Sequence, residues 1–229
     1  MTHSAIAISQ EETPTAWYRQ VAAVFFRHGY LKGVGTTVFI TLFFNLYFYF
    51  LKNPAFPITV MPLTWLDQQI ELQPLALPIY LSMWVYVSLA PALLATRREL
   101  GFYALAIAAT CLFGLLTFYF WPTTVPAALV DWTRYPELDF LKTIDASGNA
   151  CPSLHVAAAV FSGIWLHHLL RRYGGPLWIL SLNWAWCIGI VYSTMAIRQH
   201  VALDVLGGLL LGLPAAWLSL RYRGVAQGR

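Results

Sequence analysis

Residues 149–165 read NACPSLHVAAAVFSGIW, and this stretch decides how the chain is organised. Most of it is apolar enough for a lipid bilayer, yet it begins with polar or helix-starting residues, namely Asn149, Pro152, Ser153 and His155. Pro and Ser are typical of a helix start, and Ser153 is the candidate N-cap. The stretch therefore predicts a membrane helix whose outer end carries either a simple cap or a chemical group.

The composition predicts an integral membrane protein. The chain has 229 residues, of which 59% are hydrophobic and only 10% charged, whereas soluble domains carry about 25% charged residues. One soluble core could not bury this much apolar surface. The three cysteines, Cys111, Cys151 and Cys187, are scattered and indicate neither a disulfide framework nor a metal site. We expect Cys111 and Cys187 to be packing residues.

Six stretches approach the roughly 20 apolar residues that a transmembrane helix needs. They cover residues 33–51, 76–96, 101–121, 155–170, 176–196 and 201–220. The fourth is short, so we expect its helix to begin within the 149–165 stretch. The predicted fold is an all-α polytopic membrane bundle of about six transmembrane helices. The aromatic side chains of the first helix are expected to face lipid.

We expect three regions along the chain. Residues 1–32 form an N-terminal leader, 33–222 the six-helix membrane domain, and 223–229 a short basic tail. The first 15 residues are polar and do not resemble a cleavable signal peptide. Residues 16–31 mix aromatic and basic side chains, which favours an amphipathic helix at the membrane interface. A plain solvated leader is the alternative.

The distribution of Lys and Arg predicts the orientation of the chain. The two long loops, about 52–75 and 122–154, contain few of them. If the N-terminus is cytoplasmic, ten of the fourteen basic residues lie on that side: Arg19, Arg27, Lys32, Arg97, Arg98, Arg171, Arg172, Arg221, Arg223 and Arg229. We therefore expect both termini in the cytoplasm and both long loops outside. A bacterial inner membrane, with the site facing the periplasm or exterior, fits this short chain.

A second polar cluster lies at residues 192–208, YSTMAIRQHVALDVLGG. His200 and Asp204 are four residues apart, a spacing that makes them neighbours on one helix face. An aspartate within a membrane segment indicates function by default. Asp204 could bind one imidazole nitrogen and leave the other free as a nucleophile. A purely structural salt bridge to His200 or Arg198 is the alternative.

The predicted topology brings the two clusters to one membrane face. His155 lies at the outer end of the fourth helix, and His200 joins the fifth helix to the sixth at the same outer side. A helix N-terminus presents free N–H groups to an anion, so His155 would face an anion bound there. Arg198 offers a planar fork of donors that suits phosphate.

The two motifs together resemble the type-2 phosphatidic acid phosphatase superfamily. PSLH followed by HxxxD carries the resemblance, which covers roughly residues 76–218. Leu154 stands where members usually have Gly, and Thr194 follows Ser193 where Arg is usual. Both departures resemble the branch that includes inositol phosphorylceramide synthase-like and sphingomyelin synthase-like phosphotransferases. The family's early motif, Lys followed seven residues later by Arg-Pro, is absent.

The resemblance implies a role for three residues. His200 is the nucleophile that attacks phosphorus and forms a phosphohistidine, and Asp204 orients it. His155 is the general acid for the leaving oxygen and then the general base for the acceptor. The resemblance implies no metal and no cofactor.

The phosphate contacts are predicted less sharply than the catalytic residues. Ser153, Asn149 and Arg198 are the expected phosphate-binding residues. Arg134 and Lys142 are alternatives for the missing basic motif. Asp145 could tune His155 or cap its own loop.

Three functions compete at this point. The first is hydrolysis of a lipid phosphate or pyrophosphate headgroup, and the second is transfer of that phospho-group to another lipid or to a sugar. The third is a non-enzymatic transporter that relays protons through His200 and Asp204, although the repeats typical of transporters are not evident. The expected partners are a membrane lipid bearing a phosphate headgroup and the bilayer itself. No feature indicates nucleic acid or an oligomeric state.

Other polar residues have simpler explanations. Asn183 is expected to form an interhelical hydrogen bond, and the sequence GGLLLG at 207–212 allows close helix packing. His167 and His168 are expected to be interfacial polar residues, with a haem or metal role as the alternative.

Overall fold

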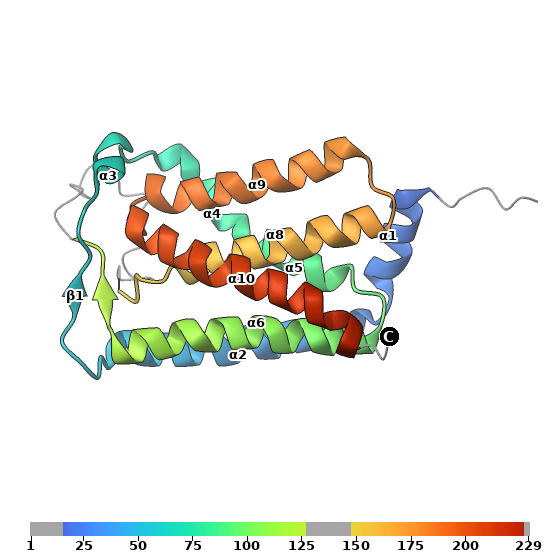
Figure 1. Ribbon diagram of the computed structural model, residues 1–229, viewed down its shortest axis with the longest axis horizontal. Helices are drawn as coiled ribbons and strands as arrows, with labels where there is room; N and C mark the ends of the chain where they lie inside the picture. Colours follow the sequence, from blue (N-terminus) through green and yellow to red (C-terminus); the bar gives the residue numbers. More distant parts are fainter. Residues whose placement is uncertain (1–15, 127–147, 227–229) are drawn as a thin grey trace, which may run out of the picture.

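The computed structural model describes residues 16–126 and 148–226, and it is a bundle of helices that run along a common axis (Figure 1). In chain order the elements are α1 (Trp17–Phe26), α2 (Gly29–Lys52), β1 (Thr59–Val60), α3 (Trp65–Gln69), η1 (Pro74–Ala76), α4 (Leu77–Leu81), α5 (Met83–Ala92), α6 (Arg97–Phe120), β2 (Thr123–Thr124), α8 (Leu154–Arg172), α9 (Leu177–Ala196) and α10 (Ala202–Ala226). The two short strands pair in parallel. The predicted all-α fold is confirmed.

Within the described residues, five helices are long and apolar enough to cross a membrane. They are Gly29–Lys52, Pro74–Ala92, Arg97–Phe120, Leu177–Ala196 and Ala202–Arg223. The remaining predicted span, residues 155–170, corresponds to α8, which packs against α10, α9, α5 and α6. Twelve of its nineteen residues are buried. Because α8 is the core of the bundle and largely shielded by protein, it can carry His and Ser side chains that a lipid-facing helix would not tolerate.

Two boundaries differ from those predicted. The predicted amphipathic helix over 16–31 is shorter, because His28 adopts a left-handed conformation with φ 57° and separates α1 from α2. The second span consists of three short helical pieces, η1, α4 and α5, rather than one continuous helix. α1 has no buried residue and crosses the end of the bundle at a steep angle (Figure 1).

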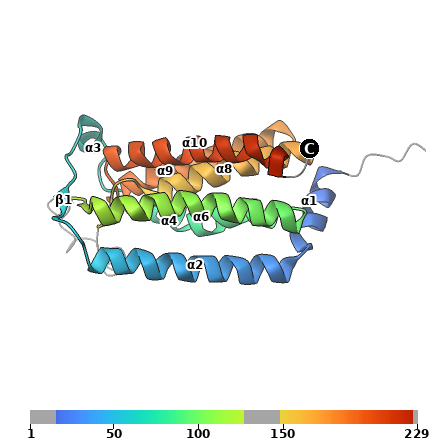
Figure 2. The same cartoon turned by 60° about the horizontal axis from the view of Figure 1, so that its bottom comes forward.

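The two ends of the bundle carry different elements. At one end lie α3, the β1–β2 pair and the starts of α8 and α10, and we call this the site end (Figure 1). At the opposite end lie α1 and the last turns of α10, so the described chain begins and finishes on the same side (Figures 1 and 2).

The contact between α8 and α10 is unusually close, as the GGLLLG sequence predicts. A Cβ added at Gly208 would lie 2.5 Å from the Ser153 carbonyl oxygen, and one at Gly212 would lie 2.6 Å from the Ala157 carbonyl oxygen. Such approaches to backbone atoms leave no room for a side chain. The glycines therefore bring the start of α10 against the start of α8.

Asn183 confirms the expected interhelical hydrogen bonds. Its Nδ2 donates to the Gly163 carbonyl at 3.1 Å, and its Oδ1 accepts from the Tyr86 hydroxyl at 2.8 Å. These bonds join α9 to α8 and α5 within the buried interior.

Gly212→Ala is expected to destabilise the protein by about 1–3 kcal/mol, because the added methyl group overpacks the α8–α10 contact. Thermal denaturation in detergent measures this effect. Gly101→Ala is the matched control, since a Cβ there meets nothing within 4 Å and both changes improve helix propensity equally. Equal shifts for the two variants would contradict the packing argument.

Candidate active site

Two histidines from distant parts of the sequence meet at the site end. Nδ1 of His155, in the first turn of α8, lies 3.1 Å from Nε2 of His200, in the loop between α9 and α10. His200 is buried, with 5% of its surface exposed. The two imidazoles are therefore close enough to act on one phosphate group, as the predicted chemistry requires.

Ser153 caps α8 and joins the two motifs. Its Oγ accepts a hydrogen bond from the Val156 amide at 3.2 Å, which confirms the predicted N-cap. Its own amide donates to the Asp204 carbonyl at 2.9 Å. The backbone of the PSLH motif is thus fixed directly to the HxxxD motif.

Asp204 is fully buried behind His200. Its Oδ2 accepts from the Val201 amide at 2.9 Å and lies 3.6 Å from Nδ1 of His200. That separation is slightly long for a hydrogen bond. Within the described residues, neither His200 Nδ1 nor Asp204 Oδ1 has another hydrogen-bond partner. The carboxylate therefore faces one imidazole nitrogen, while the other nitrogen points to His155.

Tyr80 is a site residue that the sequence analysis missed. Its hydroxyl oxygen lies 3.0 Å from Nε2 of His155, and its side chain is 5% exposed. A tyrosine hydroxyl can donate to a neutral imidazole and accept from a protonated one. It can therefore hold the His155 ring in both protonation states. The chain has twelve tyrosines, and nothing in the sequence distinguishes this one.

Tyr80→Phe is expected to lower kcat about tenfold and to leave KM nearly unchanged, because one hydrogen bond that orients His155 is lost. Steady-state kinetics of the purified protein with a phosphate ester measure the two constants. Tyr86→Phe is the control: it also removes a buried tyrosine hydroxyl, but that hydroxyl bonds Asn183 and not the histidine. A larger kcat loss in Tyr86→Phe would argue against a positioning role for Tyr80.

The loop that carries His200 is held by α3. Arg198 adopts a left-handed conformation with φ 61°, and its Nη1 donates to the Asp67 carbonyl at 2.9 Å. The Asp67 side chain accepts from the Ala202 amide at 2.8 Å. Asp67 is a further residue near the site that was not predicted from the sequence. The pattern from Thr64 to Asp67 is a capping box, which could have indicated the start of α3 but not its contact with a loop 131 residues away.

The predicted phosphate-binding residues have different surroundings. Asn149, with φ 51°, borders the same pocket as the two histidines, and its Nδ2 donates to the Tyr47 carbonyl at 3.1 Å. One Arg198 donor is used by Asp67, while its buried Nε has no hydrogen-bond partner in the described part of the chain. Arg134, Lys142 and Asp145 lie outside the described residues.

All three cysteines are free and buried. Burial and the nearby Asp204 carboxylate raise the pKa of the Cys151 thiol to about 11, so it stays protonated at neutral pH and is a poor nucleophile. Cys111 and Cys187 are packed in the main hydrophobic core, as predicted. His167 accepts a hydrogen bond from the Trp184 indole at 3.1 Å. No group of three His, Cys, Asp or Glu residues within 16–126 and 148–226 could hold a metal ion.

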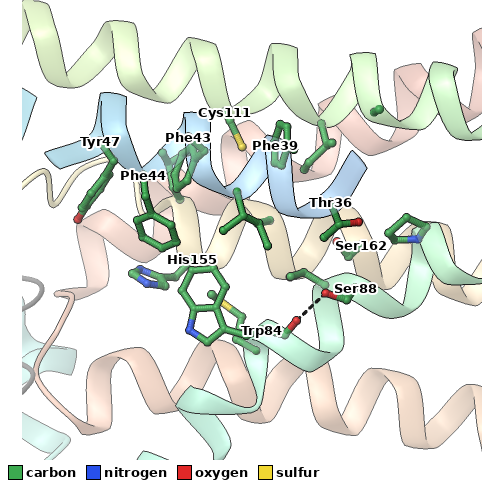
Figure 3. Close-up of a pocket in the computed structure, with 18 of the residues that line it drawn as sticks. Thr36, Phe39, Phe43, Phe44, Tyr47, Trp84, Ser88, Cys111, His155 and Ser162 are labelled. Atoms are coloured by element: carbon green, nitrogen blue, oxygen red, sulfur yellow. Dashed lines mark hydrogen bonds between the residues drawn. The ribbon is translucent and has the colours of Figure 1, made fainter. Parts of the chain in front are cut away.

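An apolar pocket, which we call the groove, leads away from the histidines. It holds a volume of about 320 Å³ between α2, α5, α6 and α8. Figure 3 shows His155 near one end and aromatic side chains of α2 along one wall. Phe39, Phe43, Phe44, Tyr47 and Phe48 line it. The expectation that the first helix turns its aromatics to lipid is therefore wrong for this face, because α2 stands off from the bundle and encloses the space.

The fold and the site define a membrane-embedded helical protein in which a buried histidine, His200, and a half-buried one, His155, lie beside the apolar groove. Residues 98–227 match the PAP2 superfamily, and the chain belongs to that family. Comparison with curated proteins and with solved structures gives no match. Membership in this family, which comprises phosphatases and related phosphotransferases, together with the membrane bundle, identifies an enzyme that acts on phosphoric esters.

Proposed function

We propose that the protein hydrolyses the phosphate or pyrophosphate headgroup of a membrane lipid through a phosphohistidine intermediate. The observation that carries the proposal is the 3.1 Å approach of His155 and His200 at one end of an apolar groove. The histidines supply the chemistry of phosphoryl transfer, and the groove supplies a surface for a hydrocarbon chain. The coincidence of the two favours a lipid phosphate over a soluble phosphate ester.

In the first step, Nε2 of His200 attacks phosphorus. A P–N bond forms, the P–O bond to the lipid breaks, and His155 gives a proton to the leaving oxygen. The imidazoles must move apart to admit the phosphoryl group, since their ring nitrogens are in direct contact. Asp204 supports the positive charge that develops on His200.

In the second step, His155 takes a proton from water, and the water oxygen attacks the phosphohistidine. The P–N bond breaks, inorganic phosphate leaves, and His200 is regenerated. Asn149, the helix start at Ser153 and the Arg198 guanidinium are the proposed donors to the phosphoryl oxygens. Rotation of Arg198 away from the Asp67 carbonyl would free its second donor for this task.

Transfer to another lipid or to a sugar is the second candidate. It is favoured by Leu154 and Thr194, which stand where hydrolytic relatives usually have Gly and Arg. The Thr194 carbonyl accepts from the amides of Gln199 and His200 at 3.0 and 3.1 Å, so this position shapes the nucleophile loop. Only the acceptor in the second step differs, since an acceptor hydroxyl replaces water.

The deciding experiment uses the detergent-purified protein, EDTA and a mixture of lipid phosphates. Release of inorganic phosphate supports hydrolysis, whereas conversion of an added diacylglycerol or sugar acceptor without free phosphate supports transfer. Absence of turnover, together with pH-dependent ion flux in reconstituted vesicles, would instead support a transporter.

We also propose that the site end faces the periplasm or exterior. Arg97 and Arg98 begin α6 and Arg171 and Arg172 end α8, at the end of the bundle opposite the site end (Figure 1), and such residues favour the cytoplasmic side. A C-terminal fusion to a reporter that fluoresces only in the cytoplasm tests this orientation. A periplasmic C-terminus would overturn it.

A further inference from the structure

The groove extends along nearly the whole of α2. Tyr47 borders it beside the histidines, and Lys32 borders it near the start of the helix. Fifteen residues at 1.5 Å per residue give a length of about 22 Å. One leaflet of the hydrocarbon core, half of about 30 Å, is shorter. A chain that fills the groove would therefore pass the middle of the bilayer.

Lys32 ends the groove with a charge. Its side chain is 8% exposed, and its ammonium group donates to the carbonyls of Val24 at 2.8 Å and Ala92 at 2.6 Å. These bonds tie together the ends of α1, α2 and α5. A hydrocarbon gains nothing by extending against an ammonium group held in this way. Lys32 is therefore the floor of the apolar space.

We propose that the groove is a binding site for one hydrocarbon chain of the lipid phosphate substrate, and that the distance from the histidines to Lys32 sets the longest chain that binds fully. The inference rests on the proposed function. The occupant is a lipid phosphate with a chain of about 20 Å, of the polyprenyl or long acyl class. The lining is mostly apolar, and His155, His200 and Asn149 border the end of the groove where a headgroup would lie.

The headgroup and the chain would occupy the site in one direction only. His155 and His200 at the outer end favour the anionic phosphate, and Phe39, Phe43 and Phe44 line the middle of the groove (Figure 3). Thr36 and Ser88 follow toward the floor (Figure 3). Ser88 donates its hydroxyl proton to the Trp84 carbonyl at 2.8 Å, so it presents little unsatisfied polarity to the chain.

Two glycines of α2 provide a matched test. Gly35 lines the groove, whereas Gly33 does not, and a Cβ at either position meets nothing within 4 Å. Gly35→Phe should fill the groove about 4.5 Å above Lys32, the rise of three residues. Gly33→Phe adds the same group to the same helix outside the groove. Ala104→Phe fills the groove from α6 and serves as a second variant.

The measurement is kcat/KM for a series of alkyl and prenyl monophosphates of increasing chain length. The wild-type value should rise with length and level off where the chain reaches Lys32. Gly35→Phe and Ala104→Phe should lower kcat/KM about tenfold or more for the longest chains, because several methylene contacts are lost, and leave the shortest chains unchanged. Gly33→Phe should give kcat/KM values close to those of the wild type at every chain length.

The possible outcomes separate the two proposals. An unchanged length profile in both groove variants, with phosphate still released, would overturn the chain site and leave the phosphatase intact. A wild-type enzyme that releases no phosphate from any member of the series would overturn the proposed function itself. If kcat/KM of Gly33→Phe also levelled off at a shorter chain length, the effect would come from the general packing of α2. This result would contradict a length limit set by the groove.

Discussion

His200→Ala is expected to lower phosphate release about 10⁴-fold or more, because removal of a nucleophile abolishes the covalent route and leaves only binding and electrostatic effects. The side chain is 5% exposed, and its Nε2 faces His155. Initial rates with a lipid phosphate, measured in detergent at saturating substrate, give the ratio. Brief acid-free denaturation of the wild-type enzyme during turnover should recover phosphate bound to protein, and His200→Ala should yield none.

His167→Ala is the control for this experiment. His167 lies toward the other end of α8, where its ring accepts a hydrogen bond from Trp184. Its removal should leave turnover within about twofold of the wild type. Protein-bound phosphate that persists in His200→Ala would place the nucleophile elsewhere and would remove the central step of the proposed mechanism. The turnover of Asp204→Asn should lie between that of His200→Ala and that of His167→Ala, because the imidazole of His200 remains but loses its carboxylate partner.

His155→Ala is expected to lower turnover of lipid phosphates by about 10²–10⁴-fold, the range for loss of a general acid–base group. The loss should depend on the leaving group. A lipid alkoxide needs a proton from His155 to depart, whereas a nitrophenolate leaves without one. In His155→Ala, the rate of the first step should therefore fall much less with nitrophenyl phosphate than with a lipid phosphate.

The same variant should accumulate the intermediate. With nitrophenyl phosphate, His155→Ala should show a rapid burst of nitrophenolate followed by slow turnover, because the second step still lacks its base. Burst amplitude and protein-bound phosphate measure the same species. Equal losses for both leaving groups, without a burst, would assign His155 to substrate binding and not to proton transfer. A thermal denaturation temperature close to that of the wild type excludes a folding defect.

Many structural features of this protein follow from local sequence patterns, whose residues lie close together in the chain. Hydropathy predicts the membrane helices, since each needs only its own apolar residues to be stable in lipid. Ser153 caps α8 as predicted, and Gly208 and Gly212 allow the close packing of α10. The four-residue spacing of His200 and Asp204 correctly indicates that they are close, but they are not neighbours on one helix face. His200 lies in the loop before α10, and Asp204 in the first turn of α10 accepts a hydrogen bond from the Val201 amide and faces the imidazole.

The tertiary structure decided the parts that depend on contacts between distant segments. Tyr80 reaches a histidine 75 residues away, and Asp67 holds a loop 131 residues away. Neither contact leaves a local pattern in the sequence, because each residue type serves many roles. The lining of the groove also could not be predicted from the sequence. The aromatic side chains of α2 are equally suited to lipid and to an apolar groove, and only the position of α2 against α5 and α6 assigns them to the groove.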